Sequence, residues 1–271
     1  MLQPQYLRQR ISERLPEGLV TPEHTSDGHF YRVQGQNMTS VLYPSVTAKL
    51  QILKDEGLMN WKMNQAIEYV STHWATAQSE EALANILKDA RQSPVDIFED
   101  AGDIGSAVHG YREKYFNNDF KIVATDCIPE DEYDVRSVSC MRALESFVLQ
   151  TGYQPIACEL PLYSHELKLG GTLDDIGLID GKLVLMDLKT SNQLKDSYWA
   201  QVALYRKMFV SLTGLRPARS FILRLSKTDG TYQIEELKDI TAVTKWAVHV
   251  VQASNGLGMV KELRKRERIT L

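Results

Sequence analysis

The sequence predicts an α/β protein whose mixed β-sheet core follows the order αβββαβ and is flanked by helices. The first observation is a set of apolar, β-rich runs in the second half of the chain, at residues 156–164, 171–179, 182–190, 219–226 and 231–236. The second is Asp180-Gly181, a two-residue hairpin signal between the second and third runs. The third is a helical pattern at about 196–212, which indicates a crossover helix and therefore a parallel pair within the sheet.

Helical patterns precede and follow this core. Apolar residues at helical spacing continue from Pro44 to Trp74, whereas residues 1–40 read as irregular or as an edge hairpin around His29–Val33. Further helical patterns lie at 80–91, from a Ser93-Pro94 start to about residue 116 with a break expected near Gly102, at 135–152, and from 241 to about 254. We therefore divide the chain into an N-terminal helical region, residues 1–95, and a core with a C-terminal helix, residues 96–271.

Composition narrows the class of protein. With 43% hydrophobic and 24% charged residues, the 271-residue chain is typical of a soluble globular protein. No apolar run approaches the roughly 18–20 residues that span a bilayer, and the first residues lack the apolar core of a signal peptide. Cys127, Cys140 and Cys158 form no C-x-x-C pair and read as free thiols in a reducing compartment. A net charge of −4 argues against a protein that coats nucleic acid indiscriminately, but it allows a local basic surface. The clearest basic run, at 261–268, is either a solvated helix end or a phosphate contact.

The Asp180-Gly181 turn also aligns charged residues. Counting outward from Ile179 opposite Lys182 places Asp174 opposite Asp187 on one face of the sheet. Like charges in that position repel each other, and a divalent cation would remove the repulsion. Lys189, two residues beyond Asp187, points to the same face. The alternative is a strand-end ion pair between Asp187 and Lys189, with Asp174 solvated.

Other residues can complete a metal shell. Mg²⁺ and Mn²⁺ prefer carboxylate, carbonyl and water oxygens. Glu159 in the adjacent strand is either a further ligand or a surface glutamate, and the backbone carbonyl of Leu188 is a further candidate. His109 shares a helical stripe with Gly102 and Gly105. It is either structural or a neutral imidazole ligand, most naturally for Mn²⁺.

Gln201 and Tyr205 stand four residues apart in the crossover helix and therefore share a face. Such a pair often reflects packing alone. Because the pair follows the strand that carries Asp187, it also suits a role in orienting the site residues or the substrate.

Together these motifs resemble the PD-(D/E)XK nuclease superfamily, in particular its RecB-like branch, and within it the mitochondrial genome maintenance exonuclease and related phage exonucleases. The resemblance covers roughly residues 43–210. Its matching segments are Gly105-x-x-x-His109, Gly171-Thr-Leu-Asp174, Asp187-Leu-Lys189-Thr-Ser, Gln201-x-x-x-Tyr205, and Tyr43-Pro-Ser-Val-Thr47 with a following helix and Trp61.

The resemblance implies a restriction-endonuclease-like core and a DNA exonuclease that uses one or two Mg²⁺ or Mn²⁺ ions on single-stranded ends, in replication, recombination or repair. It assigns metal ligation to Asp174 and Asp187, with His109 joining the shell, and activation of the attacking water to Lys189. In this scheme Gln201 and Tyr205 organise the site and the DNA. Further substrate contacts are expected from Ser45, Thr47, Thr190 and Ser191.

The resemblance also implies a helical wall or arch over the site and replication or recombination proteins as partners. The N-terminal arginines favour a transit peptide, but Glu13, Glu17 and the brevity of the segment argue against one. We therefore expect a location in the cytoplasm of a bacterium or phage-infected host rather than in mitochondria, and no membrane. Some relatives carry four cysteines for an iron–sulfur cluster; three scattered cysteines do not match, so no cluster is expected. Four aromatic residues are candidates for base stacking or for the core: Trp61, Tyr111, Tyr115 and Trp199. The alternatives are an inactive DNA-binding module and a duplex-specific or structure-specific nuclease.

Overall fold

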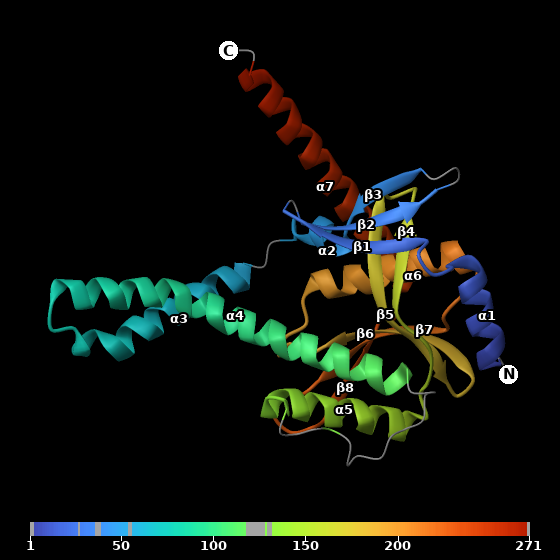
Figure 1. Ribbon diagram of the computed structural model, residues 1–271, viewed down its shortest axis with the longest axis horizontal. Coiled ribbons are helices and arrows are strands. Elements are labelled where there is room, and N and C mark those ends of the chain that lie inside the picture. Colours follow the sequence, from blue (N-terminus) through green and yellow to red (C-terminus); the bar gives the residue numbers. More distant parts are fainter. Residues whose placement is uncertain are drawn as a thin grey trace.

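The computed structural model describes residues 3–26, 28–35, 39–53, 56–117, 128 and 132–269. It shows a mixed α/β protein with a five-stranded mixed sheet, a three-stranded antiparallel sheet and seven α-helices in this part of the chain (Figure 1). In chain order the elements are α1 (Pro4–Arg14), β1 (Val20–Thr25), β2 (Gly28–Gln34), β3 (Ser40–Pro44), α2 (Val46–Leu50), α3 (Glu56–His73), a 3-10 turn at Trp74–Thr76, α4 (Glu80–Asn117), α5 (Val135–Thr151), β4 (Gln154–Ser164), β5 (Leu169–Ile179), β6 (Lys182–Lys189), α6 (Asp196–Thr213), β7 (Arg219–Leu225), β8 (Tyr232–Glu236) and α7 (Ile240–Ile269).

The larger sheet has the strand order β4-β5-β6-β7-β8. Only the β6–β7 pair is parallel, and α6 makes the crossover between these strands. The element order from α5 to β7 is therefore the αβββαβ order that the sequence predicts. The hairpin register is also confirmed, from Ile179 opposite Lys182 to Asp175 opposite Met186. Asp180 and Gly181 both have positive φ angles, 51° and 69°, as a two-residue turn of this kind requires.

Strand β6 is buried on both faces. Leu183 and Leu185 belong to the core that includes α6 and α7, whereas Val184 and Met186 belong to a second core that includes α4 and α5. A slip of one residue would exchange the two sets. Burial therefore fixes which face receives Asp187, a buried residue of the same strand.

The region before α3 contains more β-structure than expected. A three-stranded sheet, β1-β2-β3, stands where the sequence indicates irregular structure or one hairpin. Its joining point to the larger sheet is Gly170 on β5, which forms a bridge with Ser45. A Cβ atom on Gly170 would lie 2.2 Å from the Cβ of Tyr31, so glycine is required for this close approach. The tertiary contact that orders the small sheet leaves no local pattern in residues 1–40.

Helix α4 is one continuous helix of 38 residues, where the sequence suggests a new start at Ser93-Pro94 and a break near Gly102. An interior proline removes a helical hydrogen bond and costs about 3 kcal/mol; here neighbouring helical turns and packing on α3 outweigh that cost. The helix also crosses the expected boundary after residue 95. Its first half and α3 form an arm that projects away from the sheets (Figure 1).

Two smaller observations concern the apolar length of the helices and the state of the cysteines. No helix in the described ranges is both long and apolar enough to cross a membrane. Cys140 and Cys158 are free thiols, whereas Cys127 lies outside the described residues.

Candidate metal centre

Three elements bring one histidine and two carboxylates together. His109 of α4, Glu159 of β4 and Asp174 of β5 each offer a ligand atom, and these atoms all lie within 4.8 Å of one another. The Nδ1 atom of His109 is 3.0 Å from Oε1 of Glu159, and its Nε2 atom is 4.0 Å from Oδ2 of Asp174. An imidazole and two carboxylates at this spacing can hold a divalent cation.

Glu159 reaches this cluster through an unusual backbone conformation. Its φ angle is 47°, in the left-handed region that costs a non-glycine residue about 1–3 kcal/mol. The register of β4 against β5 also shifts between Pro155 and Ala157. Such irregularities in a strand re-aim side chains near functional sites. The sequence carries no signal for this bend. From sequence, Glu159 is a candidate ligand only because it lies in the strand next to Asp174.

Sequence reasoning missed Arg112, which is fully buried on α4 one turn after His109. One of its Nη atoms pairs with Glu159, and the other lies 3.2 Å from Oδ2 of Asp175. The pKa of Asp175 is nevertheless raised, because burial outweighs the attraction of Arg112. The signal that could have identified Arg112 is its spacing of three residues from His109, since residues at i and i+3 share a helix face.

Asp174 and Asp187 occupy the positions just beyond the last paired residues of the β5–β6 ladder. Oδ2 of Asp174 accepts a 2.7 Å hydrogen bond from the backbone N–H of Leu188. The ligand role expected for the Leu188 carbonyl stays a prediction.

The two aspartates differ in electrostatics. Burial raises the pKa of Asp187 to about 6; Lys189 opposes this shift, and Asp174 adds to it. Burial also acts to raise the pKa of Asp174, but His109, Lys189 and Arg112 together hold it below its usual value. Among the described residues, Nζ of Lys189 is the one partner of the Asp187 carboxylate, through Oδ2, and Oδ1 has none. Because buried charges need partners or a metal, Asp187 fits a cation ligand.

Lys189 is the only cation that touches Asp187 within the described ranges, with Nζ 2.6 Å from Oδ2. Burial acts to lower the pKa of Lys189, but Asp187 and Asp174 raise it above its usual value. The lysine is therefore protonated beside the two carboxylates. A lowered pKa, as expected for a proton acceptor, requires positive charge to offset these carboxylates.

Gln201 and Tyr205 contact each other, as their spacing predicts. Nε2 of Gln201 donates a 3.0 Å hydrogen bond to the Tyr205 hydroxyl. The Tyr205 ring is buried against β5, where a Cβ on Gly171 would lie 2.5 Å from Cε1 of the ring. Because Gly171 has no side chain, the Tyr205 ring can pack directly against β5 at the Gly171–Asp174 segment. Contact of Gln201 or Tyr205 with a substrate stays a prediction.

The hydroxyl residues expected to bind substrate have other contacts as well. Oγ of Ser45 accepts a hydrogen bond from the N–H of Ala48 and caps α2, and it lies 3.0 Å from Oγ1 of Thr47. Ser191 donates to the carbonyl of Gln193. Thr190 lies where α4 crosses the end of β6, because its Oγ1 is 3.8 Å from the Cβ position of Gly105. Substrate contacts by all four hydroxyl residues stay predictions.

An open cavity of about 740 Å³ adjoins the cluster. Its wall includes His109 and Glu159, and α4 contributes the small residues Gly102, Gly105, Ser106 and Gly110. Tyr111 and Tyr115 point instead into the core, and the Tyr111 hydroxyl donates to buried Glu145. These two tyrosines are therefore core residues rather than base-stacking surfaces.

Comparison with known proteins gives weak similarities. No family model matches the chain, and no curated protein matches it. Among solved structures, an alkaline exonuclease (LHK-Exo) from Laribacter hongkongensis aligns with a TM-score of 0.31 and 16% identity, over 47% of this chain and 70% of its own. The protein SSO0001 aligns with a TM-score of 0.27 and 16% identity, over 57% of this chain and 74% of its own. These alignments are too weak to assign a fold or an activity.

Proposed function

We propose that this protein is a Mg²⁺- or Mn²⁺-dependent deoxyribonuclease that hydrolyses phosphodiester bonds from single-stranded ends. The observation that carries the proposal is the convergence of His109, Glu159 and Asp174 within 4.8 Å, beside the buried Asp187–Lys189 pair. His109, Asp174 and the Asp187–Lys189 pair belong to the segments that resemble the RecB-like nucleases, and this supports a restriction-endonuclease-like use of the sheet.

In this proposal His109, Glu159, Asp174 and Asp187 hold the cation. When bound, a divalent cation supplies an activated water and stabilises the extra negative charge of phosphoryl transfer. Nζ of Lys189, fixed by its 2.6 Å contact with Asp187, orients the attacking water and accepts its proton once positive charge nearby has lowered the lysine pKa. Arg112 holds Glu159 in the cluster.

The choice of DNA, of single-stranded ends and of a role in replication, recombination or repair rests on the resemblance. The open cavity beside His109 and Glu159 is consistent with a strand that reaches the cluster from outside. Proteins of replication or recombination are the partners that such an activity would serve.

The test is release of nucleotides from end-labelled DNA by the full chain with Mg²⁺ or Mn²⁺. We expect Asp187→Asn to abolish release because it removes a ligand charge, and Lys189→Ala to abolish it because it removes the amine. Lys182→Ala is the matched control, since Lys182 is exposed at the other end of the same strand. Full activity in both site variants would refute the assignment.

Parallel substrates separate the alternatives. Release from single-stranded but not circular DNA identifies an exonuclease, whereas cleavage of circles identifies an endonuclease, and activity confined to duplex DNA identifies a duplex-specific enzyme. Binding of DNA without release in either cation would identify a binding module.

A further inference from the structure

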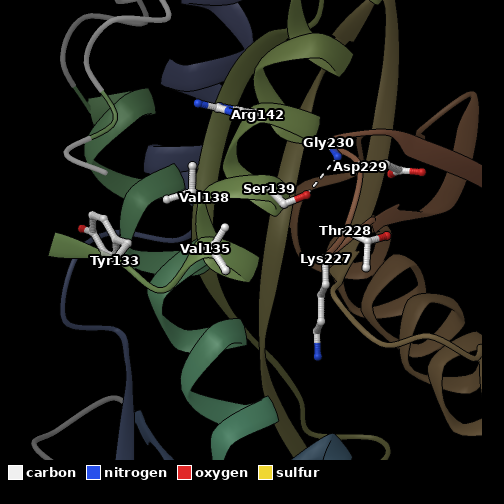
Figure 2. Close-up of a pocket in the computed structure, with 9 residues that line it drawn as sticks. All are labelled: Tyr133, Val135, Val138, Ser139, Arg142, Lys227, Thr228, Asp229 and Gly230. Atoms are coloured by element: carbon white, nitrogen blue, oxygen red, sulfur yellow. Dashed lines mark hydrogen bonds between the residues drawn. The ribbon is translucent and has the colours of Figure 1, made fainter. Parts of the chain in front are cut away.

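Two cavities at the β7–β8 end of the sheet share part of their lining. The first, about 370 Å³, lies between α5 and the β7–β8 turn (Figure 2). The second, about 260 Å³, lies between the same turn and the loop that follows β6. Both are lined by Lys227, Thr228 and Asp229. We call these two adjoining cavities together the turn groove.

The turn groove begins next to the candidate metal centre. Ser191 and Asn192, which line its second cavity, follow Lys189 almost directly in the chain. Arg224 lies beside Lys189 in the parallel β6–β7 register, and its Nη1 atom donates a 2.7 Å hydrogen bond to the Asn192 carbonyl. The second cavity therefore lies at the same end of β6 as Lys189.

The charged lining of the groove is mainly cationic. Arg142, Arg224 and Lys227 carry positive charge, and Asp229 carries the one negative charge among the residues that line the two cavities. Oδ1 of Asp229 accepts hydrogen bonds from the N–H and hydroxyl of Thr231, at 3.1 and 2.7 Å. The acid is thus engaged in its own turn.

Lys227 is the cation best placed to meet a ligand. Arg224 uses its guanidinium to hold Asn192 and Gln233. Lys227 is half-buried and has no hydrogen bond or ion pair with any residue that the structure describes. Its side chain extends away from the hydrogen bond between Ser139 and the Gly230 N–H (Figure 2).

The rest of the first cavity is apolar. Tyr133, Val135 and Val138 line it on the α5 side (Figure 2). A surface that combines cations with an aromatic ring and aliphatic side chains suits a single strand, whose phosphates need charge and whose bases need a stacking or apolar contact.

We propose that the turn groove binds the phosphodiester backbone of the single strand that extends from the metal centre, with Lys227 contacting a phosphate. This inference rests on the proposed nuclease function, because it extends the path of the same substrate. The recognised chemistry is a phosphate group, which a nucleic-acid strand, a mononucleotide or inorganic phosphate can each provide.

Binding tests the inference without catalysis. The anisotropy of a labelled single-stranded oligonucleotide is measured with the full chain in EDTA over a range of salt concentrations. We expect Lys227→Ala to weaken binding several-fold and to reduce the slope of log Kd against log salt by about 0.7, the value for one lost contact with a single strand. Lys227→Glu should weaken it further. Lys245→Glu is the matched control, since Lys245 is exposed on α7 and lines neither cavity.

Substrate length provides a second measurement. In the presence of the cation, Lys227→Ala should raise KM for a long oligonucleotide by a larger factor than KM for a dinucleotide, which is too short to occupy the groove. Circular dichroism establishes that both lysine variants fold.

The outcomes are separable. Wild-type affinity and salt slope in both Lys227 variants would overturn the groove assignment, whether or not the protein cleaves DNA. Equal, Lys227-dependent competition by inorganic phosphate or a mononucleotide at matched phosphate concentration would also overturn it, because the groove would then be a site for a small anion. Lys227-dependent strand binding without nucleotide release would support the groove and count against the nuclease.

Discussion

At the scale of single residues, Arg112 is the side chain on which the geometry of the centre depends most. It is fully buried and contacts Glu159 and Asp175, which lie on different strands. A buried pair that loses one partner leaves an uncompensated charge and typically costs 3–5 kcal/mol. Arg112 therefore holds Glu159 from the buried side, while His109, on the preceding turn of α4, contacts Glu159 from the cavity.

The buried Glu145 leads to a prediction about how the free energy of unfolding depends on pH. Burial raises its pKa above the usual value of 4.5, although the Tyr111 hydroxyl donates a hydrogen bond to it. Folding therefore favours the protonated acid, and this carboxyl group destabilises the fold increasingly as pH rises through its folded-state pKa. We expect Glu145→Gln to raise the free energy of unfolding at neutral pH and to leave it nearly unchanged below pH 4.5, since the glutamine oxygen still accepts from Tyr111.

The measurement is urea unfolding of both proteins between about pH 4 and pH 8. Glu145→Ala serves as the control, because it removes the hydrogen bond and should destabilise the protein throughout this range. A Glu145→Gln difference that does not grow with pH would contradict the assignment.

At the scale of elements, α2 depends on its cap. This helix has five residues, and the Ser45 hydroxyl accepts from the N–H of Ala48 at its start. We expect Ser45→Ala to lower the free energy of unfolding by about 1 kcal/mol and Ser45→Thr to retain most of it, because threonine keeps the capping oxygen. Urea denaturation checks both. Equal losses in the two variants would show that the hydroxyl contributes through something other than the cap.

The elements also show which parts of the fold were predictable. The β5–β6 hairpin and its register followed from Asp180-Gly181, because both positive φ angles are local requirements of the turn. The pairing of Gln201 with Tyr205 followed from helical spacing in the same way. In each case, residues close in sequence determine the contact.

Other features arise from contacts between distant segments. Glu159 has a positive φ angle, although it is not one of the residue types that favour this conformation. The sequence of the strand therefore does not predict the bend. The β1–β3 sheet docks on Gly170, more than a hundred residues away, and residues 1–40 carry no pattern that reports it. Ser93-Pro94 favours a helix start through a clear local preference, whereas the α3–α4 packing that keeps the helix continuous is a tertiary contact.

At the scale of the whole molecule, the centre connects α4, which packs in one core, with the paired strands β4 and β5, whose buried side chains lie largely in the other. His109 comes from α4, Glu159 from β4 and Asp174 from β5. A cation that binds all three only in the folded state stabilises it by about 2.7 kcal/mol when its concentration is 100 times Kd. We expect Mg²⁺ or Mn²⁺ to raise Tm relative to EDTA, as followed by calorimetry.

Asp174→Asn should abolish this increase, because the amide keeps an acceptor for the Leu188 N–H but loses the charge. Asp180→Asn is the matched change on the same hairpin and should retain it, since asparagine tolerates the left-handed conformation of the turn. An undiminished increase in Asp174→Asn would place the cation elsewhere.

The continuity of α4 has a mechanical consequence. At about 1.5 Å per residue, its 38 residues extend about 57 Å, from the tip of the projecting arm to Asn117, and the turn that carries His109 and Arg112 lies near the second of these ends. An unbroken helix tilts as a single rod, so a macromolecule that grips the arm and swings it would shift both side chains together. Binding at the arm would therefore change how His109 and Arg112 lie relative to Glu159 and Asp174 on the sheet.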